Sequence, residues 1–417
     1  MDLSLTQQVL MWGFLVAVVM GAVANKTNFC TMGAVSDWVN INDTGRMRSW
    51  VFAMVVAIVG VLALDVAGVM DPAVTAVGPG QADPFTGVSA FPPYRTGNFV
   101  WLGHLIGGLV FGIGMTLGSG CGNKTLVRLG GGNLKSLVVL AFIALGAYLM
   151  MFHTPTQRLL QVPMSSAAVD LSSLGAADQS LGGILGPVVG ASAGAANMVL
   201  GILLALGMLA WVVKSADFRS RFNNILGGAV IGLGVVAAWY VTAGPMGQKW
   251  MGELAMASQN PVQHAAAQSY TFISPAGDLG RFVTEGFGTN LLSFGLLALA
   301  GVIMGSLLWA LVSRTFRFEW FASWKDAGNH IIGGFLMGIG GVMGMGCTIG
   351  QGVTGISTLA VGSFLTFAAI VVGAALTMKV QYYKLVYEEE ATFPKALIAG
   401  LADLKLVPNG MRSLEQI

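Results

Sequence analysis

The chain has 417 residues, of which 55% are hydrophobic and 10% are charged, and its mean hydropathy is +0.73. A soluble domain carries about 25% charged residues, so this composition excludes a soluble protein and predicts a polytopic membrane protein. The formal net charge of +2 gives no indication of a nucleic-acid partner, and none is expected. The three cysteines form no C-x-x-C pair, and an odd number cannot close a disulfide framework.

Apolar runs long enough to cross a bilayer, about 20 residues each, recur along the whole chain. We therefore predict an all-α polytopic membrane protein with about nine transmembrane helices. The segments 71–97 and 244–286 are expected to be long outer loops. The predicted spans are 8–24, 50–70, 98–120, 134–152, 195–213, 225–243, 287–312, 329–346 and 359–378.

Basic residues divide unequally between the two sides that nine alternating spans define. Of the 21 lysines and arginines, 17 fall on one side and only Arg95, Arg158, Lys249 and Arg281 fall on the other. Basic loops stay in the cytoplasm. The pattern predicts a multi-pass protein of the bacterial inner membrane with its N-terminus outside and its C-terminal tail in the cytoplasm.

Two stretches of the chain are copies of each other. HLIGGLVFGIGMTLGSGC (104–121) and HIIGGFLMGIGGVMGMGC (330–347) align without a gap, and both begin with histidine and end with cysteine. Alternating spans make the two copies run in opposite directions, which predicts inverted repeats with a substrate path near the bilayer midplane. The expected division is a first repeat with outer loops at 1–193, a connector helix at 194–224, a second repeat at 225–378 and a cytoplasmic tail at 379–417.

The sequence after each repeated cysteine is too polar and glycine-rich for a lipid-facing helix. Cys121 is followed by GNKTLVRLGGGN and Cys347 by TIGQGVTGIST, and Cys30 lies in a similar stretch, NKTNFCTMG. Irregular backbone at membrane depth must be buried in protein or line a path. We expect re-entrant breaks followed by short helices, whose N-termini favour an anion. The matching place after the sixth span is near Gly244, where no cysteine occurs.

The motifs NFCTMG, GCGNKT and MGCTIGQG resemble those of the YeeE/YedE family of bacterial membrane proteins. The resemblance implies uptake of sulfur compounds, thiosulfate in particular, with relatives linked to other sulfur or selenium species. It also implies that one cysteine of each motif takes part, here Cys30, Cys121 and Cys347. A small cytoplasmic sulfur-carrier protein is a further partner that the resemblance implies.

The predicted chemistry is that of a transporter, with no catalytic residue, metal or cofactor. Thiosulfate is a dianion with a soft terminal sulfur, and neutral thiols offer it weak S–H donors. A thiolate would repel it, and apolar surroundings favour the neutral thiol. Several weak sites in sequence permit both entry and release. The residues expected along the path are Cys30, Cys121, Cys347, Gly120, Gly122, Gly346, Lys124 and Gln351.

Other interpretations remain open at this point. A buried lone cysteine often acts as a small hydrophobic residue, and Lys124 also fits a basic inner loop. His104 and His330 are expected to be hydrogen-bond partners between helices rather than substrate ligands. A soft-metal conduit is an alternative because thiols bind Cu(I), and a thiol-based membrane redox enzyme is another, although no cofactor motif supports it.

Overall fold

The computed structural model describes residues 3–78, 81, 88–257 and 265–415. Within these ranges the chain is a helical bundle, and one two-stranded antiparallel pair, β1 (Asn98–Phe99) with β2 (Val169–Asp170), is its only sheet. In the described ranges, eight helical segments are long and apolar enough to cross a membrane. The predicted class, an all-α polytopic membrane protein, is confirmed. The eight segments are Leu5–Ile41, Gly45–Val66, Trp101–Gly130, Lys135–Phe152, Ala193–Val213, Phe222–Ala243, Phe294–Val312 and Val361–Val386.

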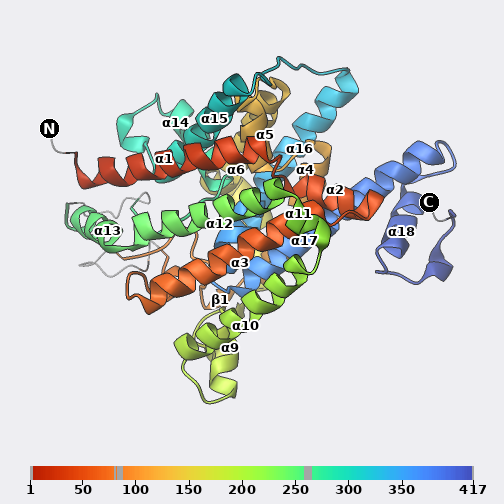
Figure 1. The fold of residues 1–417 in the computed structure, drawn as a ribbon. Helices are drawn as coiled ribbons and strands as arrows, with labels where there is room; N and C mark the ends of the chain where they lie inside the picture. Colours follow the sequence, from red (N-terminus) through yellow and green to blue (C-terminus); the bar gives the residue numbers. More distant parts are fainter. Residues whose placement is uncertain (1–2, 79–80, 82–87, 258–264, 416–417) are drawn as a thin grey trace.

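Nine long helices form the body of the described molecule (Figure 1). They are α1 (Leu5–Lys26), α3 (Gly45–Val66), α4 (Trp101–Leu117), α6 (Lys135–Phe152), α10 (Ala193–Val213), α12 (Phe222–Ala243), α15 (Phe294–Val312), α16 (Trp324–Met343) and α17 (Val361–Val386). Shorter helices fill the connections: α2 (Thr31–Ile41), α5 (Gly122–Gly130), α7 (Thr154–Thr156), α8 (Val162–Ser166), α9 (Leu181–Val188), α11 (Ala216–Ser220), α13 (Pro245–Ala257), α14 (Ser274–Thr284) and α18 (Phe393–Asp403). Single turns of 3₁₀ or π geometry are η1 (Pro72–Ala76), η3 (Gln157–Gln161), η4 (Ser172–Leu174), η5 (Thr289–Leu291), η6 (Gly350–Gly355) and η7 (Asn409–Met411).

The predicted eighth span, 329–346, forms most of α16, but α16 is not among the eight membrane candidates. Its first two turns carry Lys325, Asp326 and Asn329, which lower the hydropathy of a helix that is otherwise apolar. The helix is nevertheless enclosed, because it packs between α4 and α6. A helix that contacts protein on both sides tolerates polar turns that lipid would not.

The long helices pack in matched sets. α1 packs on α15 and α12 packs on α3, while α4 packs on α17 and α16 packs on α6. Exchanging α1 with α12, α3 with α15, α4 with α16 and α6 with α17 reproduces the same four contacts. The two copies of the repeated sequence, α4 and α16, cross each other at the centre of this arrangement. This is the packing expected of a duplicated fold.

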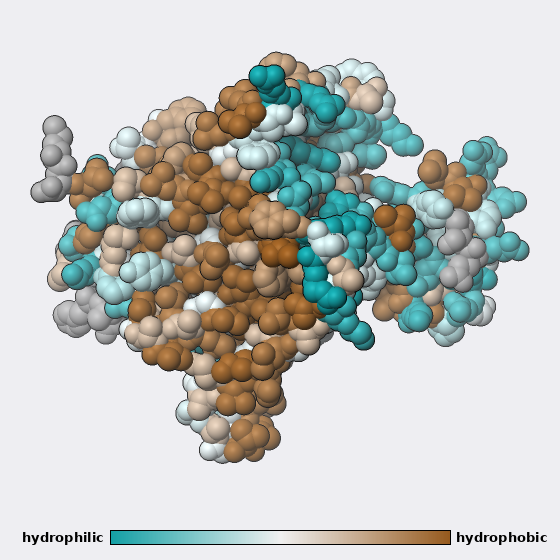
Figure 2. All heavy atoms as spheres, in the orientation of Figure 1, coloured by the Kyte–Doolittle hydropathy of each residue, from teal (hydrophilic) through white to brown (hydrophobic). Residues whose placement is uncertain are grey.

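One face of the bundle collects polar and basic side chains, and we call it the basic face. It is formed where α1 and α15 end and where α3, α6, α12 and α16 begin. Ion pairs connect these helix ends, for example Arg221 with Asp43 at 3.6 Å and Lys135 with Asp326 at 2.9 Å. Figure 2 shows it as a hydrophilic band bordering a broad apolar surface. The apolar surface has the exposure expected of a lipid-facing belt.

Two sequence predictions about loops were wrong in detail. The segment 244–286 contains α13 and α14, and its residues from Ala266 to Ile273 are buried. The described part of 71–97 also turns inward, since Tyr94 and Arg95 are buried and the Arg95 Nε donates to the Thr358 carbonyl at 2.6 Å. The remaining residues of these two segments, 79–80, 82–87 and 258–264, lie outside the described ranges.

The C-terminal tail is fastened to α17. α17 extends to Val386, eight residues beyond the predicted span, and α18 packs against it. Asp403 of α18 is buried between Lys379, at 3.3 Å, and Arg412, and it also accepts a hydrogen bond from the Tyr383 hydroxyl at 3.1 Å. A buried carboxylate with two cations and a hydroxyl has the partners that its burial requires.

Candidate functional site

Cys30 lies where the first membrane segment breaks. α1 ends at Lys26, the backbone passes through a left-handed residue at Asn28, and Cys30 forms the N-cap of α2. Its Sγ accepts a hydrogen bond from the Gly33 N–H at 3.4 Å. Asparagine adopts the left-handed conformation more readily than most residues, so the sequence supports the break at this point.

Cys121 repeats this arrangement at the end of α4. α4 ends at Leu117, Ser119 takes a left-handed conformation, and Cys121 is the N-cap residue of α5. The Cys121 carbonyl accepts a hydrogen bond from the Thr125 hydroxyl at 3.1 Å. The thiol is completely buried, although it sits at a helix N-terminus whose free N–H groups face the same space.

Cys347 follows α16 at the same spacing as Cys121 follows α4. Met345 has a φ of 57° and Gly346 a φ of 158°, after which the chain re-enters a helical stretch that includes η6. The Cys347 Sγ accepts a hydrogen bond from the Gly350 N–H at 3.4 Å. The predicted helix breaks with short helices after them are therefore present at all three cysteines.

The fold brings the three free thiols together in the interior. The Cys30 and Cys121 thiols, from different helical segments, contact each other. Cys347 lies close enough to Cys121 to interact with it electrostatically. Cys121 therefore neighbours both of the other thiols, and we call the three together the thiol series.

A fourth break of the same kind precedes α14, and the residue at the position of the cysteine is an isoleucine. Ile273 occupies the residue before α14, just as Cys30 occupies the residue before α2, and each is preceded by a buried phenylalanine. Ile273 is fully buried, and its side chain faces Gly122 and Gly341. Gly244, near which the matching place was expected, caps the end of α12, whereas the local arrangement like that of Cys30 lies farther along the chain, at Ile273.

Hydroxyl and amide groups that the sequence analysis missed accompany the thiols. The Thr348 hydroxyl contacts the Cys121 thiol and the Thr271 hydroxyl contacts the Cys347 thiol, and neither has another hydrogen-bond partner in the described ranges. Thr31 Oγ1 and Asn123 Nδ2 are also buried without a partner there. The signal available was that Thr31 and Thr348 each directly follow a cysteine and Asn123 follows one by two residues.

The other predicted path residues take supporting positions. A Cβ on Gly120 would come within 3.2 Å of the Lys124 side chain, and Gly122 opens α5 against Phe272 and Ile273. Gly346 contacts Gln351, whose Nε2 donates to the Gly344 carbonyl at 2.6 Å. Gln351 therefore braces the turn before Cys347 instead of contacting a thiol.

Lys124 lies between the thiols and the basic face. Its Nζ donates to the Asn28 side-chain oxygen, and its charge interacts with Cys30 and Cys121. The ammonium is half-buried and lines a cleft that opens at the basic face. The positive charge of Lys124 is thus placed next to the thiols and also reaches the cleft.

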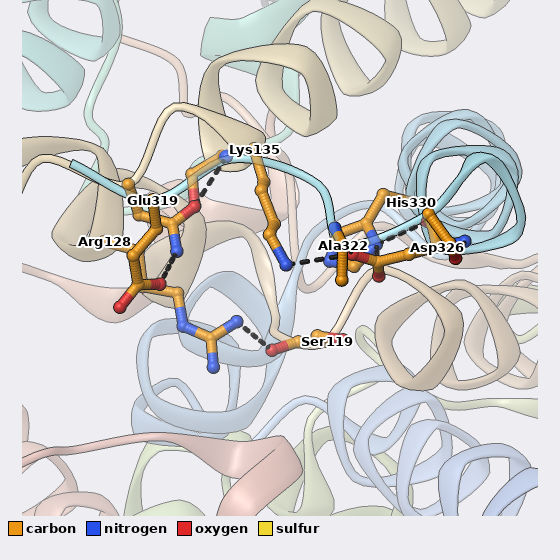
Figure 3. Close-up of polar contacts among 10 residues, drawn as sticks. Ser119, Arg128, Lys135, Glu319, Ala322, Asp326 and His330 are labelled. Carbon is orange, nitrogen blue, oxygen red and sulfur yellow. Dashed lines mark hydrogen bonds and ion pairs between the residues drawn. The ribbon is translucent and has the colours of Figure 1, made fainter.

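The two histidines of the repeat hold helix ends and do not reach the thiols in the described contacts. His104 Nδ1 is 2.7 Å from Thr366 Oγ1 on α17. His330 Nδ1 is 3.0 Å from Asp326, which also pairs with Lys135 of α6 (Figure 3). Equivalent histidines thus join equivalent helix pairs, one by a neutral contact and one through a charged cluster.

Comparison with known proteins identifies the family. The sequence model described as "Sulphur transport" matches residues 26–376. The thiosulfate transporter TsuA of Escherichia coli is 24% identical to this chain, with 82% of this chain and 86% of the relative covered. The TsuA thiosulfate transporter of Spirochaeta thermophila is 25% identical, with 87% and 96% covered. The chain therefore belongs to the sulphur transport family, and it is a membrane transporter of sulfur compounds, not an enzyme.

Proposed function

We propose that this protein imports thiosulfate, or a closely related sulfur oxyanion, across the bacterial inner membrane along Cys347, Cys121 and Cys30. The observation that carries the proposal is the series of buried thiols, in which Cys121 contacts Cys30 on one side and interacts with Cys347 on the other. The names of the two relatives support thiosulfate as the substrate.

The proposed mechanism uses weak donors at each step. Neutral thiols donate S–H groups to the anion, and the hydroxyls of Thr348 and Thr271 stand beside two of them. The N-termini of α2 and α5 add a mild positive field next to Cys30 and Cys121. The thiols and hydroxyls are uncharged donors, while the full charge of Lys124 acts on Cys30 and Cys121 from the cleft at the basic face. A series made mostly of weak partners attracts the dianion without trapping it.

We also propose that the two halves are inverted repeats, with boundaries near 1–193 and 225–378 and a connector at 194–224. The matched packing of α1 on α15 with α12 on α3, and of α4 on α17 with α16 on α6, supports this division. The basic face is proposed to be cytoplasmic, following the distribution of lysine and arginine. A small sulfur-carrier protein on that face is the partner we propose for the imported anion.

Uptake of ³⁵S-thiosulfate into proteoliposomes containing the purified protein tests the proposal. We expect uptake that is lost in Cys121→Ala and Cys347→Ala, because the change removes the S–H donor with little loss of volume. His104→Ala, which breaks a contact between helices away from the thiols, should retain more uptake than either. Full transport by both cysteine variants would rule out the thiol series as the path.

A further inference from the structure

A cleft of about 450 Å³ opens at the basic face next to the inner end of the thiol series. Its charged lining consists of Lys124 and Arg128 on α5 and of Arg317 and Glu319 on the connection between α15 and α16. A smaller polar chamber of about 190 Å³ adjoins it and shares Arg128 and Glu319 with it. The cleft is therefore a charged vestibule and not an extension of the apolar core.

The connection between α15 and α16 is fixed over the vestibule by backbone hydrogen bonds. The Arg317 N–H donates to the Gly131 carbonyl at 3.1 Å, and the Leu134 N–H donates to the Glu319 carbonyl at 3.0 Å. Arg317 is thereby held beside the end of α5, across the cleft from Lys124. The backbone at Arg317 and Glu319 is therefore fixed to the connection between α5 and α6.

The charges of the vestibule are unequal. The Glu319 carboxylate accepts a hydrogen bond from the Asn133 side chain, and the nearby Asp326 is paired with Lys135 in the adjoining chamber (Figure 3). Arg128 makes one described side-chain hydrogen bond, to the Ser119 carbonyl at 2.6 Å. A guanidinium has five N–H donors, so Arg128 retains donors for a ligand. The three cations of the cleft, Lys124, Arg128 and Arg317, outnumber its carboxylate, Glu319.

We propose that this vestibule is a second dianion-binding site, distinct from the thiols and reached from the basic face. Its ligand is a tetrahedral sulfur oxyanion such as thiosulfate or sulfate. Arg128 and Arg317 hold this anion, and Lys124 lies at the end of the cleft nearest the thiols. A cleft lined by cations concentrates anions, and guanidinium groups bind oxyanions in a forked geometry.

The role of the vestibule site in transport rests on the proposed function, because the site lies where an imported anion would leave Cys30. Two consequences follow. An anion released from the thiols is held briefly at the basic face, and sulfate or thiosulfate already present on that side competes for the same site. Uptake should therefore be inhibited by dianions on the receiving side of the membrane.

Equilibrium dialysis of ³⁵S-sulfate and ³⁵S-thiosulfate against the purified protein in detergent tests the site directly. We expect saturable binding that is about tenfold weaker in Arg128→Gln, the effect typical of losing a charge-assisted hydrogen bond. Arg317→Gln should weaken binding in the same direction. Arg314→Gln is the matched control, because Arg314 lies on the same connection, is exposed and does not line the cleft.

The Cys121→Ala variant allows the vestibule site and the transport proposal to be tested separately. Arg128-dependent dianion binding by Cys121→Ala, in a protein that transports nothing, supports the vestibule site independently of the thiols. Normal thiosulfate uptake with no Arg128-dependent binding overturns the vestibule site and leaves the transport proposal standing. If the wild-type protein binds dianions through Arg128 but shows no thiosulfate uptake, the transport proposal is overturned and the vestibule site stands.

The source of the bound anion is distinguished by lipid composition. Wild-type protein in vesicles of neutral phosphatidylcholine should be inhibited by sulfate enclosed on the side of the basic face, and Arg317→Gln should be inhibited less. A different result would identify the vestibule as a lipid-headgroup site: enclosed sulfate inhibits neither wild type nor Arg317→Gln, and added phosphatidylglycerol, but not thiosulfate, abolishes the binding of ³⁵S-sulfate in detergent. That result would overturn its assignment to a sulfur oxyanion.

Discussion

Gly107 of α4 and Gly340 of α16 lie backbone to backbone. A Cβ on Gly107 would stand 2.8 Å from the Gly340 carbonyl oxygen, and a Cβ on Gly340 would stand 2.7 Å from the Gly107 carbonyl oxygen. The same reciprocal contact joins Gly114 and Gly333, at 2.7 and 2.6 Å. The two crossings occupy equivalent positions of the repeated sequence, so one contact, made twice, sets the distance between α4 and α16.

Replacing either of these glycines should separate the helices. We expect Gly107→Ala and Gly333→Ala each to destabilise the protein by about 1–3 kcal/mol, the usual cost of overpacking a rigid contact. The control is Gly207→Ala on α10, where a Cβ meets nothing within 4 Å. Thermal stability in detergent, followed by size-exclusion chromatography after heating, measures the difference. Equal stability of Gly107→Ala and Gly207→Ala would contradict the close crossing.

Ile273 provides a test of the apolar fourth break. Its side chain fills the space between Gly122 and Gly341 beside the thiols, so Ile273→Ala leaves a cavity where water can follow an anion. We expect Ile273→Ala to lower the preference for thiosulfate over sulfate in competition uptake assays, whereas Ile273→Val keeps it. An unchanged preference in Ile273→Ala would show that this residue only packs.

The thiols should work in their neutral form. Thiosulfate uptake is therefore expected to be flat from mildly acidic to neutral pH and to fall in the alkaline range, where thiolates would repel the dianion. Cys121→Ser keeps an O–H donor but loses the soft sulfur contact, so it should be impaired at every pH. Uptake that rises steadily through the alkaline range would instead identify the thiolate as the working form.

The Asp326 cluster predicts a pH-dependent contribution to stability. The hydrogen bond from Lys135 lowers the pKa of the Asp326 carboxyl. A lowered pKa stabilises the fold above the carboxyl's unfolded-state pKa, and this stabilisation is lost as pH falls through the folded-state value.

Asp326→Asn should consequently be less stable than wild type at neutral pH, by about 1 kcal/mol at most because the pair is partly exposed. The difference in melting temperature should shrink as the pH falls below about 4. Lys325→Gln, the exposed neighbour of Asp326, is the control and should change little at either pH. A difference that grows in acid would contradict the assignment.

Membrane orientation can be tested with reporters at the two proposed sides. Fusions at Ile417 and within 71–97 should report opposite sides of the membrane, with the first in the cytoplasm, because 17 of the 21 basic residues fall on one side of the predicted spans. Both reporters on the same side would remove the basis for the inverted repeats.

The parts of the fold that the sequence predicted are those with a strong periodic or repeated signal. The helices that follow from apolar runs, such as α6 and α10, were predicted within a few residues. The breaks after Cys121 and Cys347 were predicted because glycine and polar residues interrupt an otherwise apolar run there. These are local properties that a sequence displays directly.

The parts that were missed depend on contacts between distant segments. The fourth break around Ile273 has no cysteine and follows a long polar stretch, so nothing local marks it as buried. The contact of Thr271 with Cys347 and the placement of Arg95 against Thr358 likewise arise only when remote segments meet. Burial of a polar residue by tertiary packing leaves no trace in hydropathy.

The contacts of Asp403 with Lys379, Arg412 and Tyr383 give α17 a second role. Its 26 residues form one continuous rod, about 39 Å long at 1.5 Å per residue. Thr366, near one end, holds His104 of α4, and Lys379, toward the other, holds the tail through Asp403. One continuous helix therefore links the position of the C-terminal tail to the position of α4.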